Sequence, residues 1–196
     1  MIEIAHLYIL NTCGHNCPLC CNRLYNVDKI PCITNEILSQ VHTVCLTGGD
    51  PFYLGDLPLG NLVTNIRKQF PNIKNVYIYT SGTYLRYFLA DIFKAGTIFK
   101  AGICKVHLPI EGVTISPKNE EDWKNLQYML SNYYSFFDSL VSNRLLVFQD
   151  QVELYHRYID LSILTPLNIQ VMGRKWREEF NTPDNEGFYR LPILLD

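Results

Sequence analysis

The stretch from Cys13 to Asn22, Cys-Gly-His-Asn-Cys-Pro-Leu-Cys-Cys-Asn, constrains this chain more than any other feature. Four of the seven cysteines fall within nine residues, directly after an apolar run, and Cys13, Cys17 and Cys20 have the spacing C-x3-C-x2-C. Thiolates at such spacings can converge from one loop on an iron-sulfur cluster, which normally takes four ligands. Three cysteines would leave one iron open for an external ligand, as a catalytic metal site does.

Other interpretations of the cysteine run stay open at this point. A zinc site usually needs a second ligand pair farther along, and Cys32, Cys45 and Cys104 do not repeat the C-x2-C spacing. Cys21 could complete a closed electron-transfer cluster, although adjacent cysteines rarely both reach one cube without strain. Spacing alone does not separate an open cluster from these alternatives or from chance.

Length and composition predict one domain. A chain of 196 residues can bury one sizeable core but is short for two ordinary domains, so residues 1–196 are expected to form a single unit. The net charge of −2 gives no basic field for nucleic acid. Clustered cysteines, odd in number, differ from a disulfide framework and favour the reducing cytoplasm. No export signal or membrane span is expected, since no apolar run approaches about 18 residues.

Apolar, β-prone runs alternate with helical patterns along the chain. Strands are expected at residues 2–12, 43–47, 75–80, 104–110, 144–148 and 167–172, and the longest helix at residues 117–140. This alternation predicts an α/β fold with parallel strands and right-handed crossovers. Six units do not close an eight-stranded barrel, so we expect a three-quarter barrel of (βα)6 type, with residues 173–196 as an irregular C-terminal extension.

Turn motifs follow the expected strands at the edge where parallel sheets place their chemistry. Gly48-Gly49-Asp50 follows the second strand, Thr80-Ser81-Gly82 the third, and Glu111-Gly112 the fourth. We expect all three to lie beside the cysteine loop. Each is also explained as an ordinary turn, and Glu111 also as a surface carboxylate.

Together these motifs resemble the radical S-adenosylmethionine superfamily over roughly residues 5–112. The resemblance implies that Cys13, Cys17 and Cys20 hold a [4Fe-4S] cluster and that S-adenosylmethionine chelates its open iron. Reduction of the cluster, by a donor such as flavodoxin or ferredoxin, then cleaves the cofactor, and the 5'-deoxyadenosyl radical removes a hydrogen atom from the substrate.

The resemblance also implies roles for the turn residues. Gly48, Gly49 and Asp50 resemble the superfamily's Gly-Gly-Glu, which binds the methionyl ammonium. Thr80 and Ser81 resemble the Thr-Asn that faces the methionyl carboxylate, and Glu111 takes the place of a polar residue near the ribose.

His15 lies inside the cysteine loop, where it could tune the cluster, bind it, or simply be exposed or pack on the cofactor. Leu19 departs from the family, which usually places an aromatic residue before the third cysteine.

Within the superfamily, the cysteine loop and Thr47-Gly48-Gly49-Asp50-Pro51 are most similar to the anaerobic ribonucleotide reductase activating proteins. Such an activase, an oxidoreductase, abstracts hydrogen from a glycine of a partner, the glycyl radical enzyme. Against it, Leu19 replaces a glycine and no Asp-Gly-Lys follows the fourth strand.

The alternatives belong to other classes. One is a small-molecule enzyme of lyase type that modifies a pterin or nucleobase, similar to the deazapurine synthases, with the basic residues Arg174, Lys175 and Arg177 near its substrate. The other is a non-catalytic iron-sulfur or zinc-binding protein.

Overall fold

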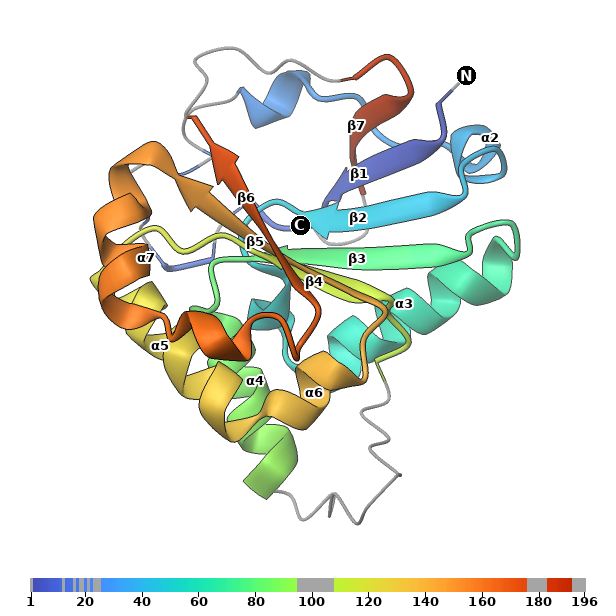
Figure 1. Cartoon of the computed structure of the whole chain (residues 1–196). Helices are drawn as coiled ribbons and strands as arrows, with labels where there is room; N and C mark the ends of the chain where they lie inside the picture. Colours follow the sequence, from blue (N-terminus) through green and yellow to red (C-terminus); the bar gives the residue numbers. More distant parts are fainter. Residues whose placement is uncertain are drawn as a thin grey trace.

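The computed structural model describes residues 2–11, 13–15, 17, 20, 22, 26–94, 108–175 and 183–191. Within these residues, seven strands form one sheet in the order β6-β5-β4-β3-β2-β1-β7, and every neighbouring pair is parallel (Figure 1). The strands are β1 Ile4–Tyr8, β2 Thr43–Thr47, β3 Asn75–Thr80, β4 Gly112–Ile115, β5 Ser142–Phe148, β6 Ile169–Arg174 and β7 Glu186–Arg190. The expected parallel α/β sheet is confirmed, and it is not closed.

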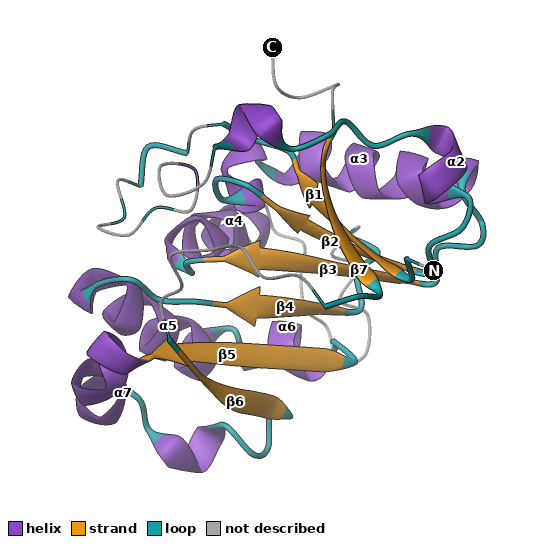
Figure 2. Cartoon of the chain, turned by 90° about the horizontal axis from the view of Figure 1, so that it is seen from above, coloured by secondary structure: helices purple, strands orange, loops and turns teal. Residues whose placement is uncertain are grey.

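The helices between the strands pack on one face of this sheet (Figures 1 and 2). They are α2 Asn35–Leu38, α3 Asp56–Gln69, α4 Thr83–Lys94, α5 Glu120–Asn132, α6 Tyr134–Asp138 and α7 Val152–Tyr158, with short 3-10 turns η1 Val27–Lys29, η2 Pro51–Leu54, η3 Gln149–Gln151 and η4 Leu161–Ile163. Polar caps fix where several of them begin. The Thr34 side chain accepts a hydrogen bond from the backbone N–H of Ile37, and Asn119 accepts one from Asp122.

The strands place successive side chains on opposite faces of the sheet. From β1 to β5 the face against the helices is buried and mainly apolar, with Leu7, Leu46, Ile78, Val113 and Leu145 at its centre. The opposite face carries polar and aromatic side chains, and we call it the polar face. Its members include His6, Cys45, Tyr77, Tyr79, Thr114, Arg144, Glu186 and Phe188.

Three expectations about the elements were wrong. The fourth strand is β4, Gly112–Ile115, whereas residues 108–110 are not in a strand and residues 104–107 lie outside the described part of the chain. The helix expected over residues 117–140 is two helices, α5 and α6, interrupted at Tyr133. Residues 173–196 are not irregular throughout, since β6 continues to Arg174 and β7 pairs with β1.

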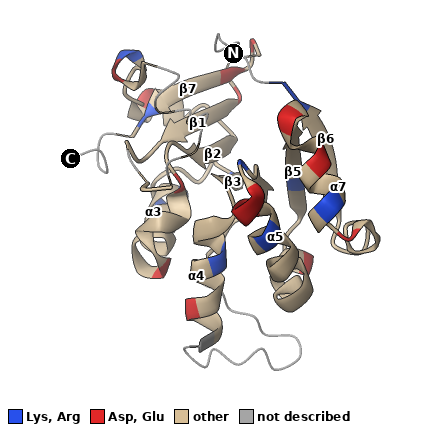
Figure 3. Cartoon of the chain, turned by 90° about the vertical axis from the view of Figure 1, so that its left-hand side faces the viewer, with Lys and Arg blue, Asp and Glu red and all other residues tan. Residues whose placement is uncertain are grey.

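Charged residues lie mainly on the helices and loops (Figure 3). The strands β1 to β4 contain no Lys, Arg, Asp or Glu, and Arg144 is the one such residue in β5. None of the described helices has the length and apolar character needed to cross a bilayer.

Candidate functional site

The C-terminal ends of β1 to β4 meet at one edge of the sheet, as parallel strands must. The loop after β1 carries the cysteines, Gly48 and Gly49 follow β2, Thr80 ends β3, and Ser116 follows β4. The backbone N–H of Ser116 donates to the Thr80 carbonyl at 2.8 Å. The motifs that follow the first three strands therefore lie on one rim, as the sequence predicts.

Cys13, Cys17 and Cys20 are all half-buried on this rim. Burial raises the pKa of the Cys13 thiol, and Asp50, Cys17 and Cys20 are close enough to raise it further. The described cysteines form no disulfide; Cys32 is exposed beside β7, and Cys45 is buried within β2. Cys21 lies outside the described residues.

Among the residues described, no three His, Cys, Asp or Glu side chains are arranged around a single metal ion. An iron-sulfur cluster is held by cysteine thiolates, normally four. The clustered thiols of Cys13, Cys17 and Cys20 are a donor set of the kind such clusters use.

Asn22 attaches the cysteine loop to the ends of β1 and β2. Its Nδ2 donates to the carbonyls of Leu10 at 2.9 Å and Asn11 at 2.7 Å, while its Oδ1 accepts from the backbone N–H of Gly49 at 3.2 Å. One side chain thus fixes the Gly-Gly turn relative to the cysteines.

Gly48 adopts a conformation that favours glycine, with φ of 78°, and a Cβ placed there would lie 2.6 Å from Cδ1 of Tyr8. The backbone of this turn therefore packs directly on β1, which no larger residue would allow.

Asp50 is buried and joins the ends of β2 and β3. Its Oδ2 accepts from Thr80 Oγ1 at 2.7 Å, from Ser81 N at 3.0 Å and from Ser81 Oγ at 3.2 Å, and its Oδ1 accepts from Phe52 N at 3.2 Å. Burial raises the pKa of Asp50, while these four hydrogen bonds act in the opposite direction. The expected cofactor residues Asp50, Thr80 and Ser81 are thus brought together, but their side chains bond to one another.

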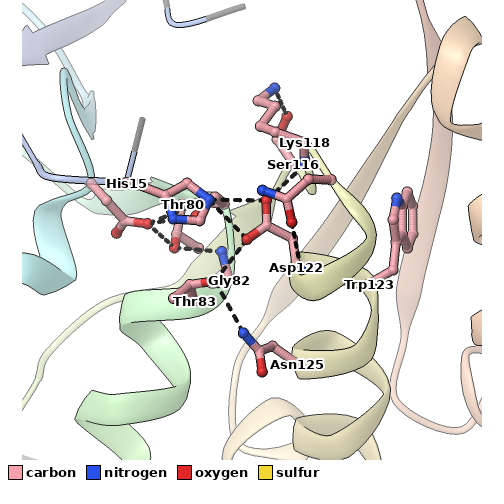
Figure 4. Close-up of polar contacts among 12 residues, drawn as sticks. His15, Thr80, Gly82, Thr83, Ser116, Lys118, Asp122, Trp123 and Asn125 are labelled. Carbon is pink, nitrogen blue, oxygen red and sulfur yellow. Dashed lines mark hydrogen bonds and ion pairs between the residues drawn. The ribbon is translucent and has the colours of Figure 1, made fainter. Parts of the chain in front are cut away.

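His15 connects the cysteine loop to α5 (Figure 4). Its Nε2 lies 2.9 Å from Oδ1 and 3.1 Å from Oδ2 of Asp122, which is fully buried. The pKa of His15 is raised to about 10, first by its hydrogen bond with Asp122 and next by one with Cys17. His15 therefore bridges a candidate cluster thiol and a buried carboxylate, and it is not the exposed loop residue that was one of our expectations.

Asp122 is itself held by further donors (Figure 4). Thr83 Oγ1 donates to Oδ1 at 2.7 Å, and the backbone N–H of Lys118 donates to Oδ2 at 2.8 Å. Asn125 donates to Thr83 at 3.1 Å, so the network reaches from α5 to the start of α4. A connected set of polar contacts therefore joins the loop after β1 to the starts of α4 and α5.

The expectation for Glu111 was wrong. Because β4 begins at Gly112, Glu111 lies at the opposite edge of the sheet from the cysteines. Its carboxylate accepts from Arg67 Nη2 at 2.6 and 2.5 Å and from the backbone N–H of Val76 at 2.6 Å. Glu111 is an ion-paired structural residue, and Ser116 occupies the place at the end of β4 that had been assigned to it.

Sequence reasoning also missed Asp122 as part of the site. It lies among three consecutive acids, Glu120 to Asp122, which are typical of a helix start. Only the helical register distinguishes it, since Asp122 lies one position before the buried Trp123 and points inward with it.

Comparison with protein-family models, with curated proteins and with solved structures gave no match for this chain. The parallel α/β sheet and its polar rim are therefore the features from which a function is inferred.

Proposed function

We propose that this protein is a radical S-adenosylmethionine enzyme that binds a [4Fe-4S] cluster and S-adenosylmethionine on the C-terminal rim of an open, three-quarter barrel of (βα)6 type. The observation that carries the proposal is the grouping of Cys13, Cys17 and Cys20 beside the Gly48-Gly49 turn and the end of β3. This grouping supports an enzyme over a closed electron carrier, because a carrier needs no second polar turn beside its cluster.

The donor set fits the cluster, and Cys13, Cys17 and Cys20 would hold it. When bound and reduced, the cluster supplies the electron that cleaves the sulfonium bond of S-adenosylmethionine. The chain's own residues position the reactants. Gly48 has no side chain, so its backbone is accessible at the rim. His15, bonded to Asp122, orients the loop that carries the thiols.

We assign Asp50 mainly a positioning role at this site. Three of the four hydrogen bonds it accepts come from Thr80 and Ser81, so it fixes the turn after β3 against the turn after β2. The backbone of Gly48 and Gly49 is then the surface offered to the methionyl ammonium, and Ser81 belongs to the turn offered to its carboxylate.

The test is anaerobic reconstitution with iron and sulfide, followed by reduction with S-adenosylmethionine present. Cys20→Ala should lose the cluster, its electronic absorption and the formation of 5'-deoxyadenosine, whereas Cys32→Ala, which removes an exposed cysteine beside β7, should retain all three. Stoichiometric zinc in place of iron, or an intact cluster in Cys20→Ala, contradicts the proposal. Cys21→Ala distinguishes an open cluster, which keeps its iron, from a closed one, which loses it.

The resemblance to activating proteins suggests a glycine of a partner enzyme as the radical acceptor. We therefore expect that loaded protein, mixed with a glycyl radical enzyme and a reductant such as flavodoxin or ferredoxin, gives a glycyl signal in electron paramagnetic resonance. A small-molecule substrate is the second candidate, and a specific observation on the polar face of the sheet favours it.

A further inference from the structure

We infer that Arg144 on the polar face binds the anionic group, a carboxylate or a phosphate, of a small aromatic or heteroaromatic substrate. The inference rests on the proposed function for its chemistry, since the substrate would lie next to the radical-forming rim. Its location is argued from contacts on the polar face of the sheet, which do not depend on the proposed function.

Arg144 is a charged side chain that has no charged partner among the described residues. It is partly buried on β5, the second strand from the β6 edge of the sheet, and its Nε is buried without a hydrogen-bond partner. Among the described residues its guanidinium forms no ion pair; its nearest ring contact is Tyr77, with Cζ 5.7 Å from the ring centroid. A partly buried guanidinium without an anion is costly to fold, so such a residue suggests a ligand that supplies the anion.

The acid Glu186, which lies on the same face, is already engaged. Glu186 Oε2 lies 2.8 Å from His6 Nε2, and the His6 ring stacks on Phe188 with centroids 4.2 Å apart. Both Glu186 and Arg144 influence the pKa of Tyr79 and of Cys45, which places all of them on one surface. Arg144 thus remains available for an anion from outside the chain.

The surroundings of Arg144 suit a flat molecule of modest size. The rings of Tyr77 and Tyr79 lie on the same face, and Tyr79 contacts the His6 ring edge-on with centroids 5.8 Å apart. Thr114 pairs with both Tyr79 and Arg144 in the sheet register and adds a hydroxyl. Aromatic faces with a few polar groups and one cation are typical of small-ligand sites.

The register also relates this face to the rim. Tyr79, Thr114 and Arg144 form one row across three strands. The strands β3 and β4 end one residue after this row, at Thr80 and Ile115, whose side chains lie on the face against the helices. One row corresponds to a rise of about 3.3 Å. A molecule anchored at Arg144 would therefore extend along the polar face to the edge at which, under the proposed function, the radical is formed.

The test is direct binding to the purified full chain, measured by calorimetry before and after cluster reconstitution. The probes are phenyl phosphate and benzoate, which separate the two anions, and benzamide, which lacks the charge. We expect at least one anion to bind and Arg144→Gln to weaken it about 10- to 100-fold, the loss typical of one charged hydrogen-bonded contact. Arg157→Gln is the matched control, because Arg157 is an exposed arginine on α7, to which no binding role is assigned.

Stability gives a second readout, which separates a binding role from a structural one. Because Nε of Arg144 has no partner, Arg144→Gln should unfold at the same urea concentration as the parent chain or a higher one. Arg144→Lys keeps the charge and should bind with intermediate affinity.

The inference is overturned if neither anion binds the parent chain, if benzamide binds as tightly, or if Arg144→Gln binds unchanged or fails to fold. These outcomes leave the proposed function untouched, since cluster assembly and S-adenosylmethionine cleavage without substrate do not involve Arg144. Conversely, failure of cluster assembly does not alter the binding of the probes to the unreconstituted chain.

Discussion

Replacing Asp50 with asparagine keeps the shape of a buried side chain but exchanges one oxygen for an amide nitrogen. The carboxylate accepts hydrogen bonds from two backbone donors on opposite sides, Ser81 N to Oδ2 at 3.0 Å and Phe52 N to Oδ1 at 3.2 Å. An amide has one oxygen, so in either orientation its NH2 group faces one of these N–H groups. One buried backbone donor therefore loses its acceptor.

The expected cost follows from this single unsatisfied donor, about 1–3 kcal/mol of the free energy of unfolding. We do not expect the larger loss, about 3–5 kcal/mol, that follows when one partner of a buried ion pair is removed. The reason is that the donors to Asp50 are uncharged backbone N–H and hydroxyl groups, so the substitution leaves no buried cation unpaired. For a chain of this length each kcal/mol lowers Tm by about 2–4 °C.

The assay is urea unfolding of the reduced chain without cluster, followed by circular dichroism. Asp91→Asn is the control, because it makes the same substitution at an exposed position of α4. If Asp50→Asn unfolds within about 0.5 kcal/mol of the parent chain, or if Asp91→Asn loses as much, the Asp50 contacts do not hold the rim together.

Three further perturbations test other contacts. Burial lowers the pKa of His6 from 6.5, so the free energy of unfolding should fall as pH drops below 6.5. The urea midpoint of His6→Gln should therefore depend less on pH below 6.5 than the midpoint of the parent chain, and an equal dependence contradicts this. Gly48→Ala should lose about 2 kcal/mol or more in urea unfolding, since its Cβ would lie 2.6 Å from Tyr8 in a left-handed conformation, and an unchanged midpoint would disprove the contact. Asp122→Asn should lose about 3 kcal/mol and speed hydrogen exchange in the cysteine loop, and unchanged exchange would mean that the loop does not depend on Asp122.

The parallel sheet and most of the rim were predictable because each strand is a short apolar run that ends in residues with special backbone demands. Gly48 and Gly49 both have positive φ, and Asp50 caps η2, so the local sequence is sufficient to predict a turn there. Such local signals do not depend on distant partners, which is why the turns after β2 and β3 were placed correctly.

The fourth strand was misplaced because its position depends on packing between strands. A Cβ at Gly112 would lie 1.6 Å from the Ser142 carbonyl oxygen, so β4 begins where only glycine fits beside β5. No pattern within residues 104–115 carries that information. The same holds for Asp122, whose partner His15 lies 107 residues away and could not be inferred from helix propensity.

The position of β7 has a consequence for the order in which the molecule is made. β1 carries the cysteine loop, and one of its two neighbours in the sheet is β7, the last strand of the described residues, with Ile4 beside Glu186. During synthesis β1 therefore stays an edge strand, with unpaired backbone groups, until residue 190 has left the ribosome. The contact between His6 and Glu186 closes only then, so the strand that presents the thiols is among the last to be fully enclosed.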